Sequence, residues 1–206
     1  MRRGLCRISI TSLLGALLIA LPSTLRAQTS GSAVYGGSPR EVSLSVNVTA
    51  SVSASCSFMV GAMPKGDYSV GNLEGPYLID IPFSLTCNSP SRVGIVSNNG
   101  GMKAHGVSSA PPGYAHQAPY RVTLHLAGDS GNSAHATCES PTLTSGASGC
   151  AFRGPATGTA GLRLPGPSQG VPGSYIRINQ TGEPQPETLI AADYSDRLTV
   201  TISPAT

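Results

Sequence analysis

The sequence predicts an all-β protein, an antiparallel β-sandwich, on three observations. Apolar and polar residues alternate in several short segments, as they do in strands that bury one face. Turn-forming residues separate these segments, and the chain contains 25 Gly and 17 Pro. No segment shows a helical period of any length. Short strands that recur between turn signals are typical of two packed antiparallel sheets.

Residues 1–27 have the features of a secretory signal peptide. Three arginines precede an apolar run from Leu13 to Leu21, and Ala27 offers a small residue at a cleavage site. The apolar run is too short for an ordinary transmembrane helix. We therefore expect export through the inner membrane to the periplasm, and no integral membrane anchor after the signal is cleaved.

Cleavage at this point would change the charge balance. Four of the 13 Lys and Arg residues precede residue 28, so nine basic residues would remain beside ten acidic ones, a formal net charge of −1. Such a chain has no basic stripe for nucleic acid and no basic amphipathic helix for a membrane surface. The remaining 179 residues of the 206 suffice for one domain with a sizeable core and an N-terminal arm.

The longest alternating segment comprises residues 42–56, which read V-S-L-S-V-N-V-T-A-S-V-S-A-S-C. An extended backbone places the apolar residues on one face. The larger ones in the first half are Val42, Leu44, Val46 and Val48. At about 3.3 Å per residue the segment would reach roughly 50 Å, more than the height of one sandwich. We therefore expect its first half to leave its own domain and pair elsewhere, with the Gly/Ser-rich residues 28–40 as a mobile tether.

Five further segments have the composition of strands or strand regions. The Asn and Gly residues at 98–101 predict a hairpin turn, whereas residues 127–160 are rich in small residues and predict a long excursion. Pro residues predict a rigid loop at 184–186, and residues 64–67 predict a turn. The five strand regions are residues 76–87, 93–97, 120–126, 175–178 and 193–202.

Four cysteines remain after signal cleavage: Cys56, Cys87, Cys138 and Cys150. An even number in an oxidising compartment predicts disulfides, for which three pairings are possible. Cys56 and Cys87 both have inward-facing phase in predicted strands, and Cys138 and Cys150 are close in sequence. We predict the pairs Cys56–Cys87 and Cys138–Cys150. A zinc site is the alternative use of four cysteines, but no C-x-x-C spacing supports it.

Two patterns suggest chemistry and are better explained without it. The residues Gly128-Asp129-Ser130-Gly131 match those around the nucleophile of trypsin-like proteases, but the A-A-H-C that surrounds the base is absent and the same residues suit a turn. The four histidines have neither i, i+4 nor H-x-H spacing, so we expect no metal site. They are His105, His116, His125 and His135. We predict that the protein is not an enzyme and uses no cofactor.

Two further local patterns carry little functional information. The sequons Asn47-Val48-Thr49 and Asn179-Gln180-Thr181 match a glycosylation pattern that is common by chance. Asp193 and Asp196 resemble a pair of catalytic carboxylates. Beside a strand, we expect them to be turn and edge charges that discourage wrong strand pairing.

Three pieces now stand in order: an alternating arm that runs into Cys56, a second cysteine about thirty residues later, and the terminal D-Y-S-D-R-L-T-V-T-I. In this order the chain resembles the spore coat protein U domain family, which includes the pilin subunits of archaic chaperone-usher pili. The terminal motif of that family, Y-x-D-x-[LV]-x-V-x-[VI], falls on Tyr194, Asp196, Leu198, Val200 and Ile202. The chain departs from the family pattern at Ala192, at its last four residues and in the loop with Cys138 and Cys150.

The resemblance implies an incomplete immunoglobulin-like sandwich that lacks its last strand and is completed by a donor strand. It also implies three kinds of partner: neighbouring pilin subunits, a periplasmic chaperone and an outer-membrane usher. The chain would then divide into a cleaved signal (1–27), a tether and donor strand (28–50) and a pilin-like domain (51–206), and would serve a surface pilus in cell adhesion or biofilm. The alternative is a monomeric secreted binding module or tip adhesin, whose loops contact a carbohydrate or another surface.

Overall fold

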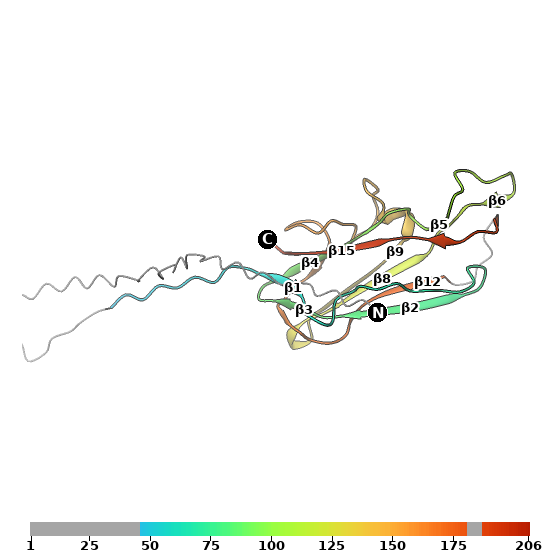
Figure 1. Ribbon diagram of the computed structural model, residues 1–206. Coiled ribbons are helices and arrows are strands. Elements are labelled where there is room, and N and C mark those ends of the chain that lie inside the picture. The colour runs from blue at the N-terminus through green and yellow to red at the C-terminus, as the bar shows by residue number, and fades with distance from the viewer. Residues whose placement is uncertain (1–45, 181–186) are drawn as a thin grey trace, which may run out of the picture. The chain divides into compact units, whose positions relative to one another are not determined.

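The computed structural model describes residues 46–180 and 187–206, which contain strands and two short 3₁₀ turns (Figure 1). Residues 50–206 form one compact unit that holds all of the strands. The strands are β1 (Cys56–Phe58), β2 (Tyr77–Phe83), β3 (Leu85–Cys87), β4 (Ser91–Ser97), β5 (Met102–Ala104), β6 (Tyr114–Ala115), β7 (Gln117–Ala118), β8 (Arg121–Ala127), β9 (Ser133–Glu139), β10 (Leu162–Leu164), β11 (Ser168–Gln169), β12 (Ser174–Gln180), β13 (Thr188–Leu189), β14 (Tyr194–Ser195) and β15 (Leu198–Pro204). The 3₁₀ turns are η1 (Asp129–Gly131) and η2 (Ser140–Leu143).

Two antiparallel sheets enclose the core. One has the order β2-β12-β8-β9 and the other the order β10-β4-β15, and Figure 1 shows β4 and β15 on one side with β2, β8 and β12 on the other. Alternate residues of both sheets point inward, as the period of two requires. The buried core includes Phe83, Val93, Ile95, Val122, Leu124, Leu126, Phe152 and Ile176. The predicted all-β, antiparallel architecture is confirmed.

Three smaller sheets extend these two. β3 follows β2 after Ser84 and lies between β1 and β11 in a three-stranded sheet. β5 lies between β14 and β7, and β13 pairs with β6 in parallel. The sandwich is therefore extended by short strands, of which β3 and β14 lie within predicted strand regions, whereas β5, β6, β7, β11 and β13 were not predicted.

The long excursion predicted for residues 127–160 is wrong in its first part. Residues 133–139, with the sequence S-A-H-A-T-C-E, form the seven-residue strand β9, which pairs with β8 along its whole length. The alternation is present, but its inward residues Ala134 and Ala136 are small, so the segment has a weak hydrophobic signal. Tertiary pairing with the strongly apolar β8 compensates for this weakness.

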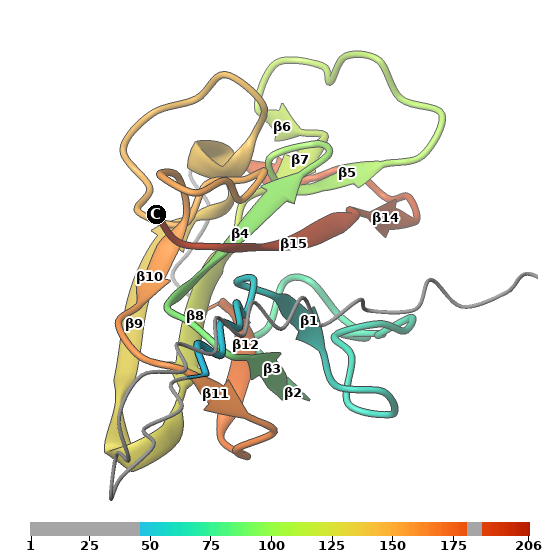
Figure 2. The ribbon, with the colours of Figure 1, turned by 90° about the vertical axis from the view of Figure 1, so that its left-hand side faces the viewer.

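The hairpin predicted at residues 98–101 is also wrong. β5 follows β4 but does not pair with it. Instead β4 pairs with β15 and β5 pairs with β14 (Figure 2). Because β14 directly precedes β15 in the chain, β4 and β5 both run along this one segment. Gly100 and Gly101 have φ values of 73° and 157°, which glycine adopts readily. They let the chain bulge away from the ladder and return to it.

In the described part of the predicted strand 42–56, which begins at residue 46, strand structure starts only at Cys56. The described residues 46–55 have no strand partner, and every one of them is exposed. Val46 and Val48 are 73% and 87% exposed. Val42, Leu44, the signal segment 1–27, the tether and the loop 184–186 lie outside the described residues. Among the described residues, no helix has the length and apolar character to cross a membrane.

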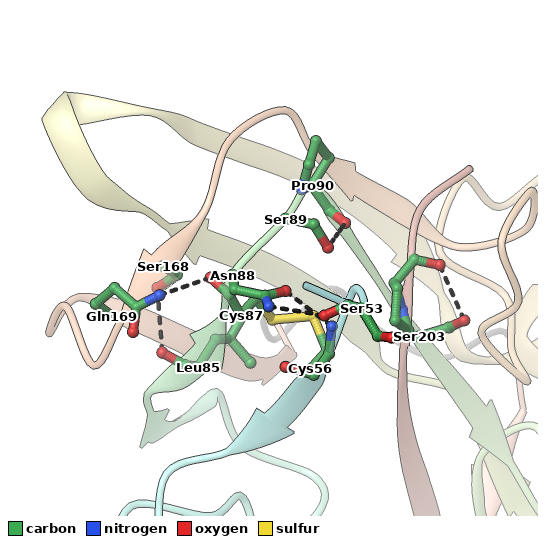
Figure 3. Close-up of a disulfide and its surroundings, with 12 residues drawn as sticks. Ser53, Cys56, Leu85, Cys87, Asn88, Ser89, Pro90, Ser168, Gln169 and Ser203 are labelled. Atoms are coloured by element: carbon green, nitrogen blue, oxygen red, sulfur yellow. Dashed lines mark hydrogen bonds between the residues drawn. A yellow bond between two sulfur atoms is a disulfide. The ribbon is translucent and has the colours of Figure 1, made fainter. Parts of the chain in front are cut away.

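Both predicted disulfides are present, Cys56–Cys87 and Cys138–Cys150. Cys56 lies directly opposite Cys87 in the β1–β3 pair, which confirms the inward phase assigned to both. Asn88 follows Cys87 and holds the chain before β1: its Oδ1 accepts from the Ser55 amide at 2.8 Å, and its Nδ2 donates to the Ser53 carbonyl at 2.9 Å (Figure 3). The residues that lead into β1 are thereby fastened to the end of β3.

Removal of the second disulfide is expected to destabilise the protein measurably. The double variant Cys138→Ala/Cys150→Ala should lose about 3 kcal/mol of unfolding free energy, because a bridge with a sequence separation of 12 restricts the unfolded chain. Urea denaturation of the purified protein measures this loss. Peptide mapping without reduction is the companion experiment, and a peptide joining Cys56 to Cys138 would contradict the assigned pairs.

Candidate functional site

β2 and β15 are edge strands, one in each main sheet. Among the described residues, β2 pairs only with β12, and β15 pairs only with β4. Pro82 lies within β2, where its missing N–H is tolerated because proline in a sheet is confined to edges and bulges. Each sheet therefore ends at a strand with one side unpaired by the described chain.

The backbone of β15 presents hydrogen-bonding groups at this edge. The Asn98 amide donates to the Arg197 carbonyl at 3.0 Å, and the Ala205 amide donates to the Pro90 carbonyl at 2.8 Å. Since the direction of backbone groups alternates along an antiparallel ladder, odd-numbered residues of β15 face β4 and even-numbered ones face away. The N–H and C=O groups that point to the free edge are those of Leu198, Val200 and Ile202. No described residue hydrogen-bonds to these groups.

The side chains of the same three residues point inward but are only partly buried against the core. Ile79 of β2, on the facing sheet, is also only partly buried against the core. A groove of about 1090 Å³ lies between the sheets at this place. Its apolar lining comes from both sheets and from β5: Ile79, Ile81, Met102, Tyr120, Ile176, Ile178, Leu198 and Val200. The segments 64–74 and 189–197 border it.

Of the terminal motif residues, Leu198 and Val200 line the groove, whereas Asp196 has a different role. Its carboxylate accepts hydrogen bonds from the Tyr120 hydroxyl at 2.7 Å and the Ser97 hydroxyl at 2.6 Å. It also accepts from the amides of Asn99 at 3.0 Å and Arg197 at 2.7 Å. The expectation that Asp196 is an edge charge is therefore wrong. This carboxylate fastens the bulge after β4 to the beginning of β15.

Tyr194, the other polar motif residue, donates its hydroxyl hydrogen bond to the Ile190 carbonyl at 2.8 Å. Two further tyrosines lie in the core near the groove. Burial, followed by the hydrogen bond to Asp196, raises the pKa of the Tyr120 hydroxyl above its ordinary range. Burial also raises the pKa of Tyr77 to about 12, and its hydroxyl has no hydrogen-bond partner within the described parts of the chain. Both side chains stay neutral at physiological pH, as an apolar groove requires.

Of the other patterns singled out in the sequence, His105 and Asp193 lie at the border of the groove, and the G-D-S-G turn lies apart from it. The residues Gly128-Asp129-Ser130-Gly131 form the turn between β8 and β9, and Asp129 Oδ1 accepts from the Gln169 amide at 3.0 Å. His105 Nε2 is 2.8 Å from the Ser195 hydroxyl. Asn47 is exposed, and Asn179 is half-buried in β12. Asp193 is exposed, and its backbone carbonyl accepts from the His105 amide.

The floor of the groove contains residues that the sequence analysis did not single out, chiefly Ile79, Ile81 and Ile178. A signal was present in β2, whose sequence Y-L-I-D-I-P-F alternates and contains a proline. A proline within an alternating run indicates an edge strand. The sequence of β2 does not indicate that β15 lies across the groove. That arrangement depends on contacts between residues about 120 positions apart.

Comparison with known proteins adds no relative. No protein family matches the sequence, and neither the curated proteins nor the solved structures include a significant match. The functional assignment therefore depends on the geometry of the groove and on the sequence of the arm.

Proposed function

We propose that this protein is an exported structural subunit of a surface pilus or coat that polymerises by donor-strand exchange. The observation that carries the proposal is the groove between the free edges of β2 and β15, whose floor is apolar and whose border, formed by the segments 64–74 and 189–197, includes polar and charged residues. A sandwich that leaves such a groove uncovered exposes apolar side chains and unpaired backbone groups together. Both are complemented by one added strand with alternating apolar residues.

The arm of a second copy has the required sequence. Val42, Leu44, Val46 and Val48 alternate with polar residues, so four apolar side chains would enter the groove in one register. Their burial offers on the order of 6 to 12 kcal/mol, before the cost of ordering the arm is subtracted. The exposure of Val46 and Val48 fits an arm that has no place in its own domain.

The backbone supports the same mode of binding. In strand addition, main-chain hydrogen bonds give attachment and alternate side chains give register. The outward N–H and C=O groups of Leu198, Val200 and Ile202 would pair with the arm along β15. Since apolar side chains of these residues also line or flank the groove, one added strand would satisfy both the edge and the core.

Assembly and export follow from the resemblance to the spore coat protein U domain family. A periplasmic chaperone would cover the groove first, and an outer-membrane usher would exchange it for the arm of the next subunit. The two disulfides suit an oxidising compartment such as the periplasm. The exported subunits would then form a fibre on the cell surface.

A sizing experiment tests the proposal. The chain produced with both its chaperone and its usher is expected to give polymers that resist SDS without boiling, and the mature chain produced without the chaperone should be poorly soluble or self-associated. Size-exclusion chromatography and unboiled gels measure both. A stable, soluble monomer that keeps residues 28–50 as a flexible tail would contradict the proposal. It would favour the alternative, a monomeric binding module or tip adhesin with a self-complete sandwich.

A further inference from the structure

The outer face of the β8–β9 hairpin carries a pair of histidines that strand addition does not use. Along this hairpin Arg121 lies opposite Glu139, Thr123 opposite Thr137, and His125 opposite His135. These side chains alternate with the buried residues of β8 and point away from the core. The two histidines are ten positions apart in sequence, so only the hairpin register places them side by side.

The ladder determines which kind of cross-strand pair they form. The Gly128 amide donates to the Asn132 carbonyl, and the Ser140 amide donates to the Tyr120 carbonyl, both at 2.8 Å. Even-numbered residues of β8 therefore belong to hydrogen-bonded pairs, and odd-numbered ones belong to non-hydrogen-bonded pairs. In the latter the Cα atoms are about 4.5 Å apart and the side chains come closest. His125 and His135 form a pair of this close kind.

The two neighbouring pairs of the same kind are in contact. Arg121 Nε is 3.0 Å from Glu139 Oε1, and the hydroxyl oxygens of Thr123 and Thr137 are 2.8 Å apart. Opposite side chains on this face therefore reach one another. His125 and His135 occupy the next pair of the same kind along the ladder.

Two contacts fix the orientation of the His125 ring. Its Nδ1 is 3.0 Å from the Gly173 carbonyl. Because a carbonyl only accepts, the hydrogen of the neutral ring is on Nδ1 and the lone pair is on Nε2. The ring also stacks on Tyr175, with 5.1 Å between centroids and 11° between planes. A carbonyl that accepts from the second nitrogen is the usual support of a metal-binding histidine. His135, on the opposite strand, is exposed.

We infer that His125 and His135 together bind a divalent first-row metal ion of the class that prefers imidazole. Cu²⁺ should bind most tightly, and Ni²⁺ and Zn²⁺ more weakly. Within residues 46–180 and 187–206 no group of three or more metal-ligating side chains is present, so solvent would complete the coordination. Ca²⁺ and Mg²⁺ prefer oxygen ligands and would not be held.

The charges on this face do not oppose a cation. Arg121 is paired with Glu139, and Arg177 of β12 is paired with Asp80 of β2 at 2.7 Å. Tyr175 lies between His125 and Arg177, whose guanidinium is 5.2 Å from the tyrosine ring. Asp129, in the turn between β8 and β9, is the other acidic residue of the hairpin besides Glu139.

Calorimetric titration of the chaperone-bound mature chain with Cu²⁺ and with Zn²⁺ tests the inference, with the chaperone alone titrated as the reference. One site is expected at neutral pH, and His125→Gln and His135→Gln should each weaken it about ten-fold or more, because the second ligand no longer acts intramolecularly. His105→Gln and His116→Gln are matched controls and should leave the affinity unchanged. Electron paramagnetic resonance of the Cu²⁺ complex should report two nitrogen ligands.

His125→Gln also removes the ring that stacks on Tyr175, so its effect on affinity includes any structural disturbance. His135 is exposed, so His135→Gln tests metal binding without that disturbance. An affinity for both ions that is unchanged in His135→Gln would overturn the inference. An equal loss in the two control variants would also overturn it, since binding would then belong to scattered histidines.

Discussion

Subunits with Leu44→Asp or Val46→Asp are expected to fold and to bind their chaperone but to form no SDS-resistant polymers. In the proposed complex either side chain enters an apolar groove whose lining includes Ile79, Ile178 and Val200. A lone carboxylate in such a place costs several kcal/mol, a large part of the gain from the whole arm. The measurement is the ladder of unboiled gels and the count of fibres on the cell surface.

Ser45→Asp is the matched control. It adds the same charge one residue away, but its side chain points out of the groove in this register, so assembly should continue. If Ser45→Asp blocks assembly while the other two variants do not, the register is shifted by one residue. If none of the three blocks assembly, the donor-strand assignment is wrong.

A mixing experiment distinguishes loss of the arm from loss of the groove. A Val46→Asp subunit keeps an intact groove, so it should accept the arm of an unaltered subunit and then end the chain. Co-production of the two subunits is therefore expected to shorten the ladders progressively. Unchanged ladder length would indicate that the altered subunit fails to fold or to leave its chaperone.

Asp196→Ala is expected to lower the free energy of unfolding by about 3 kcal/mol. This is the largest loss expected from substitution of a polar residue of the terminal motif. The carboxylate accepts four hydrogen bonds. Its removal takes away the carboxylate that accepts from the hydroxyl of Tyr120, a residue only 2% exposed. An unpaired buried hydroxyl costs about 1 to 3 kcal/mol, and bonds to a charged group contribute more than neutral ones. Urea denaturation of the chaperone-bound subunit, at one fixed chaperone concentration for all variants, measures the change.

Two variants separate the contributions. Tyr120→Phe removes one of the four bonds without leaving an unpaired hydroxyl, and it should cost about 1.5 kcal/mol. Asp193→Ala changes an exposed carboxylate three residues away and should cost less than about 0.5 kcal/mol. A similar loss in Asp193→Ala and Asp196→Ala would show that the charge of this segment, rather than the hydrogen bonds of Asp196, is what matters.

Strand identity could be read from the sequence wherever the alternation included large apolar residues. β8, β12 and β15 were predicted on that basis, and the phase of Cys56 and Cys87 led to the correct disulfide. β9 was missed because its inward residues are small. The bulge at 98–101 was mistaken for a hairpin, because Asn and Gly permit left-handed backbone in either setting.

The sequence by itself determined the all-β class, the inward face of the principal strands and the apolar character of the arm, since these depend on neighbours within a few residues. Pro82 marks β2 as an edge strand in the sequence, but only the tertiary structure decided which other edge faces it across the groove, because that depends on residues far apart in the chain. The same holds for Asp196, whose hydrogen-bond donors include Ser97 and Tyr120, 99 and 76 positions away. The tertiary structure also decided that His125 and His135 lie opposite each other, because this depends on the register of the β8–β9 hairpin. Contacts between distant residues depend on packing of the whole sandwich, and no local pattern encodes them.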